Sequence, residues 1–317
     1  MKVVNFFYRI YFLLPNFGRI GKVGKGIDRV LDIYILKKIY DWYAPKKFIK
    51  ENSKELGINT EKREEEYIVS LTSFPARINL SWISIECLMR QSFKPDRIIL
   101  WLAEEQIDMD ELPESLLILK GRGLEIEFCD DIKSHKKYFY AMKNYPNANI
   151  LTFDDDLYYD SYVVENLIKL HEKFPKNIVS NRAHKIRFSG DKLMPYRIWH
   201  HNVIDNEPSF KLFHTSGAGV LFPGGCLAKE TFDKDLIKEL SLRSDDVWLK
   251  VMSIRNDIKL VTNDRYNKDF STVRNSQIES LVFENTIQGG KDEKLNQVLT
   301  YFNMDLYKIL NNVNINN

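Results

Sequence analysis

Between residues 67 and 174, the apolar positions of the chain follow two periods in alternation. Short apolar runs typical of buried strands occur at 68–73, 97–102, 124–129 and 150–153. Between them, apolar residues recur at helical spacing over 80–88, 113–120 and 136–145, and a further helix is expected to run to Phe174 from a cap at Asp160 or Ser161. Strands that alternate with helices predict an α/β fold with a mainly parallel, doubly wound sheet. In such a sheet the ligand binds beyond the carboxyl ends of the strands.

Residues 1–50 have another pattern, in which basic and large apolar residues are interleaved. They contain 11 Lys or Arg against 3 Asp. Glycines are expected to divide this stretch into two short helical pieces: Gly18, Gly21, Gly24 and Gly26. The composition favours binding to an anionic membrane surface, and it also fits a helical extension that packs on the main domain and shows its charges to water.

The pattern divides the chain into three expected units. Residues 1–60 form the basic helical extension with a charged linker, and residues 61–270 form the main domain. Residues 271–317 form a C-terminal helical segment, in which the apolar spacing over 291–311 predicts an amphipathic docking helix.

Charge and cysteine usage narrow the classes of protein. The formal net charge is +2, and the excess of basic residues lies at the N-terminal end, so the sheet domain does not favour nucleic acid as a partner. The three cysteines are scattered and odd in number, which favours free thiols in a reducing compartment: Cys87, Cys129 and Cys226. No apolar run approaches the roughly 18 residues that span a bilayer. We therefore expect a cytoplasmic protein with peripheral contact to the inner face of the cell membrane.

Three consecutive carboxylates follow the fourth expected strand: Asp154, Asp155 and Asp156. Like charges at this spacing repel one another unless a cation lies between them, and Mg²⁺ and Mn²⁺ prefer carboxylate oxygen and keep positions open for phosphate. Alternation along a strand predicts that Asp154 and Asp156 face one side and Asp155 the other. The alternative interpretation is a solvated acidic turn.

A second pair of acids lies about ninety residues further on. Ser244 is expected to cap a helix whose first turn contains Asp245 and Asp246. Acids in a first turn also stabilise the helix dipole, by well under ~1 kcal/mol each. One set of carboxylates can hold a metal on a diphosphate, and a second can take a proton from an incoming hydroxyl. Together they predict the displacement of a nucleoside diphosphate from a sugar.

The segment between the two acid sets favours a binding surface. Residues 182–216 are rich in His, Arg and aromatic side chains and lack periodicity. The apolar run that follows is bounded by glycines over 217–225, which lets a second molecule approach the backbone closely.

Five segments carry a resemblance to a known family: 69–77 (VSLTSFPAR), 91–98 (QSFKPDRI), 131–138 (DIKSHKKY), 152–156 (TFDDD) and 244–249 (SDDVWL). Over about residues 67–260, the sequence resembles the metal-dependent nucleotide-sugar glycosyltransferases of the GT-A fold. The resemblance lies close to the bacterial family 2-like group that builds surface polysaccharides such as capsules. The ordered series at these intervals is more specific than the acid triplet alone.

The resemblance implies a role for each matching residue. Asp156 would bind Mn²⁺ or Mg²⁺, and Asp154 would face the ribose or reach the metal through water. Asp246 would be the catalytic base, with Asp245 as the alternative, and transfer would invert the anomeric centre. The donor, a UDP-sugar, would contact Thr72, Ser73, Phe74, Arg77, Lys137, Asp154 and Asp155. The sugar and a saccharide or lipid-linked acceptor would lie near His214, Gly217 and Trp248.

Some of these assignments compete with plainer ones. The pattern is also compatible with structural roles for three of them. Lys137 can be a solvated helix lysine, His214 a core or strand-edge histidine, and Trp248 a core aromatic. Many GT-A enzymes supply a histidine after the base as a metal ligand, and this chain has none beyond His214. The metal would then be held by protein mainly through Asp156, with diphosphate and water completing the shell.

Two other functions compete with glycosyl transfer. A sugar-phosphate nucleotidyltransferase also uses acids on Mg²⁺, but it usually has a glycine-rich basic loop after the first strand, and residues 72–77 contain no glycine. The other is a non-catalytic carbohydrate-binding protein.

Overall fold

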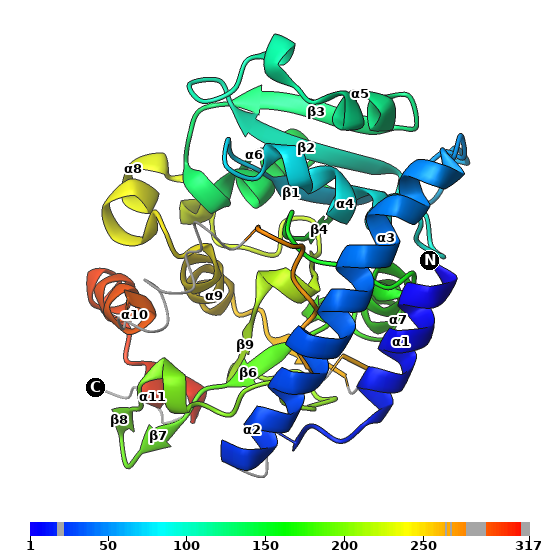
Figure 1. The fold of residues 1–317 in the computed structure, drawn as a ribbon. Helices are drawn as coiled ribbons and strands as arrows, with labels where there is room; N and C mark the ends of the chain where they lie inside the picture. The colour runs from blue at the N-terminus through cyan, green and yellow to red at the C-terminus, as the bar shows by residue number, and fades with distance from the viewer. Residues whose placement is uncertain (18–21, 264, 267, 277–289, 312–317) are drawn as a thin grey trace.

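The computed structural model describes residues 1–17, 22–263, 265–266, 268–276 and 290–311. At its centre, the described residues form a seven-stranded sheet in the order β11-β5-β10-β4-β1-β2-β3 (Figure 1). The strands are β1 (Tyr67–Thr72), β2 (Arg97–Ala103), β3 (Leu124–Cys129), β4 (Asn149–Thr152), β5 (Ile178–Ser180), β10 (Val220–Phe222) and β11 (Leu260–Thr262). Neighbouring strands are parallel, except that β10 runs antiparallel to both β4 and β5. The predicted α/β architecture with a mainly parallel sheet is confirmed.

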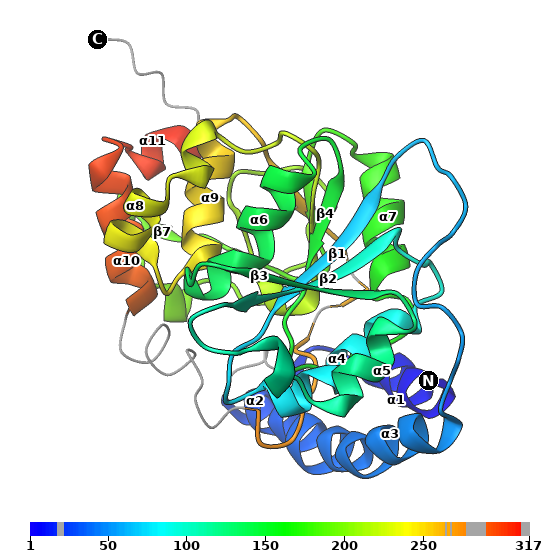
Figure 2. The same cartoon turned by 90° about the horizontal axis from the view of Figure 1, so that it is seen from above.

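Helices cover both faces of this sheet (Figure 2). The chain contains α4 (Ile78–Met89), α5 (Glu114–Lys120), α6 (Lys136–Asn144), α7 (Val163–Lys173), α8 (Lys234–Leu236), α9 (Asp245–Arg255), α10 (Gly290–Tyr301) and α11 (Leu306–Leu310). Four short strands stand apart from the central sheet as two pairs: β6 (Ala183–Lys185) with β9 (Leu212–His214), and β7 (Phe188–Ser189) with β8 (Lys192–Leu193). Both pairs belong to the segment that was expected to form a binding surface.

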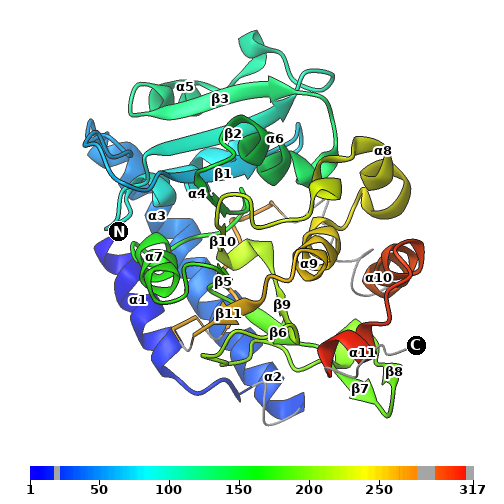
Figure 3. The ribbon, with the colours of Figure 1, turned by 180° about the vertical axis from the view of Figure 1, so that it is seen from behind.

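Alternation along the strands sorts the core into two sides. Val69 and Leu100 belong to one hydrophobic cluster with α4, α5, α7 and the N-terminal helices. Ile99 and Ile150 face the other way, into the cluster that contains Ala141 of α6. Figure 3 shows β5, β10 and β11 from behind, with α7 on one side and α9 and α10 on the other. Burial on both faces explains why these strands read as continuous apolar runs.

The N-terminal segment packs on the main domain as two long helical stretches. The first is α1 (Lys2–Leu13), and the second runs without a break through α2 (Lys22–Arg29), the π-helix η2 (Val30–Leu36) and α3 (Lys37–Glu51). Tyr8 is fully buried, and its hydroxyl donates to the carbonyl of Tyr158 at 2.7 Å. Two of the four glycines expected to break the helices lie inside α2, and the other two lie outside the described residues. At Gly24 a side chain would collide with the Phe17 carbonyl, so this glycine serves close packing.

Other details differ from the sequence prediction at element ends. Neither Asp160 nor Ser161 is the N-cap of α7; Tyr162 is, and the Asp160 carboxylate accepts from its backbone N–H at 2.7 Å. The expected terminal helix is interrupted, because α10 ends at Tyr301 and α11 starts at Leu306. Among the described helices, none has the length and apolarity needed to cross a bilayer.

Candidate active site

A cleft of about 2330 Å³ lies at the carboxyl edge of the sheet. Its walls include the loops after β1, β3 and β4, the segment 182–204, residues 215–217, the first turns of α9 and α10, and parts of the N-terminal helices. The β1–β4 pair is the point where the strand order reverses, and ligands bind at such points in open α/β sheets. Small-molecule sites usually measure roughly 300–1,000 Å³, so this cleft has room for two substrates.

The acid triplet lies beyond the strand that leads to it. β4 ends at Thr152, and Asp155 and Asp156 already belong to a turn. Strand alternation therefore does not sort the three carboxylates as predicted. Asp155 and Asp156 share one cation, and Asp154 has another.

Arg77, in the loop after β1, is the cation shared by two of the acids. Its guanidinium lies 3.1 Å from Asp155 and 2.9 Å from Asp156, and the hydroxyl of Ser73 also donates to Asp155. Burial alone would lower the pKa of Arg77, but the charges of Asp156 and Asp155 outweigh it and hold that pKa above its ordinary value. For Asp155, burial has the larger effect and raises its pKa. These contacts tie the loops after β1 and β4 together.

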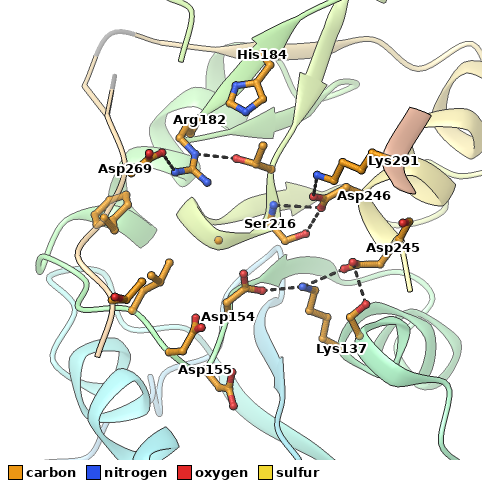
Figure 4. Close-up of a pocket in the computed structure, with 18 of the residues that line it drawn as sticks. Lys137, Asp154, Asp155, Arg182, His184, Ser216, Asp245, Asp246, Asp269 and Lys291 are labelled. Atoms are coloured by element: carbon orange, nitrogen blue, oxygen red, sulfur yellow. Dashed lines mark hydrogen bonds and ion pairs between the residues drawn. The ribbon is translucent and has the colours of Figure 1, made fainter. Parts of the chain in front are cut away.

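Lys137 joins the two acid sets (Figure 4). Its amine lies 2.7 Å from Asp154 and 3.0 Å from Asp245, and its side chain is only 4% exposed. Burial acts to lower the pKa of Lys137, but Asp154 and Asp245 more than offset it and raise that pKa, so the amine stays charged. The interpretation of Lys137 as a solvated helix lysine is wrong.

The position of Lys137 follows from how α6 is attached to the sheet. The hydroxyl of Ser70 on β1 donates to the carbonyl of Lys137 and accepts from the Trp101 indole at 3.0 Å. Just before α6, the ring of His135 bonds the hydroxyl of Tyr138 at 2.7 Å and the carbonyl of Ser241 at 2.8 Å. The first turn of α6 is thus fixed between β1 and the segment that leads into α9.

Asp245 and Asp246 lie in the first turn of α9, with Ser244 as the N-cap residue, as predicted. Asp245 accepts a hydrogen bond from Ser134 at 2.9 Å, in addition to its ion pair with Lys137. Burial acts to raise the pKa of Asp245, but Lys137 outweighs it and keeps that pKa below its usual value. This acid is therefore ionised and held on the side of the cleft that carries Lys137.

Asp246 is held by a different set of groups. One oxygen accepts from both the backbone N–H and the hydroxyl of Ser216, and the other lies 3.2 Å from the amine of Lys291 (Figure 4). Burial acts to raise the pKa of Asp246, but Lys291, His214 and Lys137 together lower it below its ordinary value. The side chain is 14% exposed, so an ionised carboxylate with fixed orientation is still accessible from the cleft.

Lys291 and Ser216 are site residues that sequence reasoning missed. Lys291 belongs to the first turn of α10, and its amine also lies 4.6 Å from the ring centre of Tyr196. The only signal at Lys291 was a basic residue at the start of an expected docking helix, which is common on any solvated helix. Ser216 lay between the two quoted features His214 and Gly217, but an isolated serine carries no pattern.

The predicted site residues fall into two groups in the structure. Nearly all of them line the cleft: Thr72, Ser73, Phe74, Arg77, Lys137, Asp154, Asp155, Asp156, Gly217, Asp245 and Asp246. His214 and Trp248 do not, since they are 1% and 0% exposed and pack in the core around α9. Burial lowers the pKa of His214 to about 4, so its ring is neutral. Both residues therefore have the alternative role in the core, and the prediction that they lie near the sugar or the acceptor is wrong.

The wall opposite the acids is aromatic and basic. Arg182 donates to the hydroxyl of Thr215 at 2.8 Å and pairs with Asp269. Tyr196 and Trp199 also line this wall, with ring centres 5.1 Å apart. Both aromatics are mostly buried, so they shape the wall more than they offer a stacking platform.

Comparison with known proteins does not identify a family for this chain. No protein-family model matches the chain, and no curated protein matches it. Among solved structures, it is similar to a cytidylyltransferase from Leptospira borgpetersenii serovar Hardjo-bovis (strain JB197), with 12% identity and a TM-score of 0.39 over 81% of this chain and 100% of that chain. A likeness this loose carries no argument about the reaction.

The carboxylates of the cleft fit one form of divalent-metal site. No group of three or more His, Cys, Asp or Glu side chains within the described ranges is arranged to enclose a metal ion. Mg²⁺, however, is usually bound through one or two carboxylates and completed by substrate phosphates and water. Asp154, whose side chain is 33% exposed, and Asp156 both line the cleft and supply that number of carboxylates.

Proposed function

We propose that the chain is a metal-dependent glycosyltransferase of the GT-A kind. It would move a sugar from a nucleotide-sugar, with a UDP-sugar as the preferred donor, to a saccharide or lipid-linked acceptor in the synthesis of surface polysaccharide. The observation that supports this most is that Lys137 pairs with both Asp154 and Asp245. This bridge brings the acid triplet, which can hold a metal on a diphosphate, and the separate ionised pair of acids on α9 to one cleft. We further place the protein in the cytoplasm, at the inner face of the cell membrane.

The two acid sets divide the chemistry between them. Asp154 and Asp156 would hold Mn²⁺ or Mg²⁺, which would neutralise the diphosphate of the donor. Lys137, buried and charged beside Asp154, adds a fixed positive charge where the departing diphosphate becomes more negative. Thr72, Ser73, Phe74 and Arg77 flank the nucleoside.

Asp246 acts as the general base. It takes the proton of the acceptor hydroxyl while the hydroxyl oxygen forms a bond to the anomeric carbon, and the bond from that carbon to the diphosphate breaks with its electrons leaving on the nucleoside diphosphate. Attack from the face opposite the leaving group inverts the anomeric centre. Ser216 and Lys291 hold the carboxylate in place and keep it ionised, and Asp245 is the alternative base.

Thermal unfolding with nucleotides tests donor binding. UDP with Mn²⁺ should raise the melting temperature, while either one alone should raise it less, because a ligand that binds only the native state stabilises it. Asp156→Ala should remove the dependence on metal. If no nucleoside diphosphate shifts the melting temperature with either metal, the non-catalytic carbohydrate-binding alternative is favoured.

Product analysis separates the two enzymatic alternatives. A glycosyltransferase given a panel of nucleotide-sugars and saccharide acceptors releases the nucleoside diphosphate. A nucleotidyltransferase given a nucleoside triphosphate and a sugar phosphate releases pyrophosphate. Pyrophosphate release that depends on Asp156, with no nucleoside diphosphate release, would overturn the proposal.

A further inference from the structure

The N-terminal helices have an outward side that the fold leaves uncovered. More than half of the large apolar side chains exposed in the described part of the chain belong to residues 1–50. On the second helical stretch, Tyr34, Trp42 and Ile49 are 59%, 66% and 69% exposed. The inward side of the same stretch is buried at Leu36 and Tyr40, so the uncovered side is not a badly packed core.

Lysines alternate with aromatic residues along this side at one-turn spacing: Tyr34, Lys38, Trp42 and Lys46. The amine of Lys38 lies 5.7 Å from the ring centre of Tyr34, and that of Lys46 lies 5.1 Å from the ring of Trp42. We call these four residues, with Ile49, the outer face. Tyr and Trp with neighbouring lysines are typical of the headgroup level of a bilayer.

The charges of residues 1–50 are sorted between the two sides. The three acids of this segment turn toward the main domain. Asp28 pairs with Lys268 at 3.5 Å, and the carboxylates of Asp32 and Asp41 accept hydrogen bonds from the hydroxyls of Ser271 and, at 2.8 Å, Tyr158. Exposed basic side chains of these helices include Lys2, Arg9, Lys38, Lys46 and Lys50. The outward side therefore combines positive charge with apolar surface, which complements an anionic bilayer.

The helices that carry the outer face also contribute, from their inward side, to the candidate active site. Tyr11, Asp28 and Asp32 line the same cleft as the acid triplet, so α1, α2 and η2 form part of its wall. Figure 2 shows α1, α2 and α3 together along one edge of the molecule. A surface bound along that edge would lie beside the cleft.

We propose that the outer face binds the surface of an anionic phospholipid bilayer. Trp42 and Tyr34 enter the headgroup region while Lys38 and Lys46 contact lipid phosphates. This orientation lets an acceptor anchored in the same bilayer reach the cleft from the membrane plane, a step that rests on the proposed function; lipid binding itself does not.

Co-sedimentation of the full chain with vesicles tests the proposal. We expect binding to vesicles of phosphatidylglycerol and phosphatidylcholine, little binding to phosphatidylcholine alone, and weaker binding as salt rises. Lys38→Gln with Lys46→Gln should weaken partitioning roughly 25-fold, since each basic residue near an anionic surface contributes roughly fivefold. Trp42→Ser should weaken it as well. Lys229→Gln with Lys238→Gln, two exposed lysines near α8, is the matched control and should bind like the natural protein.

Three results would overturn the proposal. These are no binding to the anionic vesicles, equal binding to both vesicle types, and equal loss in the lysine pair and its control. If the protein does not bind vesicles but forms a dimer, and Trp42→Ser dissociates that dimer, the outer face would instead be the contact surface for a second copy of the chain. Thermal shifts with UDP and Mn²⁺ on the same variants separate the two proposals, because outer-face substitutions should leave them unchanged.

Discussion

Replacement of Lys250 by methionine is expected to stabilise the protein. Lys250 lies in α9, its side chain is 1% exposed, and its amine has no hydrogen-bond partner among the residues that the structure describes. Burial lowers the pKa of Lys250 from 10.5 to about 7. Methionine has a similar length and shape without the charge, so it should fill the same space without that cost.

The size of the effect follows from the pKa shift. A change from 10.5 to about 7, at roughly 1.4 kcal/mol per unit, corresponds to about 5 kcal/mol of lost stability when the lysine is charged in both states. Relaxation and water entry reduce such penalties, so Lys250→Met should raise the free energy of unfolding near neutral pH by about 2–4 kcal/mol.

The pH dependence is specific to this mechanism. Between about pH 7 and 10.5 the unfolded chain keeps the Lys250 proton that the folded protein releases, so the stability of the natural protein rises with pH across this window. The advantage of the methionine variant should therefore be full below pH 7 and shrink toward pH 10.

Urea unfolding at pH 6.5, 8 and 9.5, values chosen to bracket roughly the titration of the folded lysine, measures the gap. Lys169→Met is the matched control, because the Lys169 side chain is 68% exposed on α7 and should change stability by less than about 0.5 kcal/mol. A Lys250→Met protein that is less stable than the natural one, or a gap that does not change with pH, would refute the reasoning.

Further predictions concern the cleft. Asp246→Asn should keep the thermal shift with UDP and Mn²⁺ and lower transfer by roughly 10²–10⁴-fold; loss of both together would remove Asp246 from the role of base. Lys291→Met should raise the pKa of Asp246, so the acid limb of the pH–rate profile should move to higher pH, and an unchanged profile would contradict the pairing. Gly217→Ala should weaken donor binding, seen as a smaller thermal shift with UDP and Mn²⁺, because its methyl group would lie 3.2 Å from Asp154 and 3.3 Å from Leu157. Gly219→Ala should instead destabilise the fold in a melting experiment, since φ there is +97° and the Phe153 ring is 2.4 Å from the added carbon.

Local patterns were enough to predict most elements around the sheet. The apolar runs that became β1 to β4 and the helical spacings that became α4 and α6 are set by neighbouring residues, so the sequence shows them directly. The direction of β10 was not predictable, because a three-residue apolar run reads the same in either direction. The cap of α7 was missed because Asp160 accepts from the helix start without being the cap residue.

The candidate site was predictable only where its residues form clusters along the chain. Asp154 to Asp156 and Asp245 with Asp246 stand out as runs of like charge, whereas their partners are single residues on other elements. The partner of Asp246 lies on α10, and the contact exists only because tertiary packing brings α9 and α10 together. The sequence also could not show that the N-terminal helices bury one side against the main domain and expose a basic, apolar side, because this depends on which acids turn inward.

The reversed direction of β10 makes residues 181–219 an excursion that starts and ends at the same edge of the sheet. The chain leaves the sheet at the end of β5, builds residues 181–219 above it, and returns through β10 at the same edge. Insertions, deletions or exchanges in this excursion can leave the strand pairing and the loops after β1 and β4 intact. Exchange of the excursion between related chains would therefore change one wall of the cleft and keep the loops after β1 and β4, and the same cut points suit the construction of chimaeras.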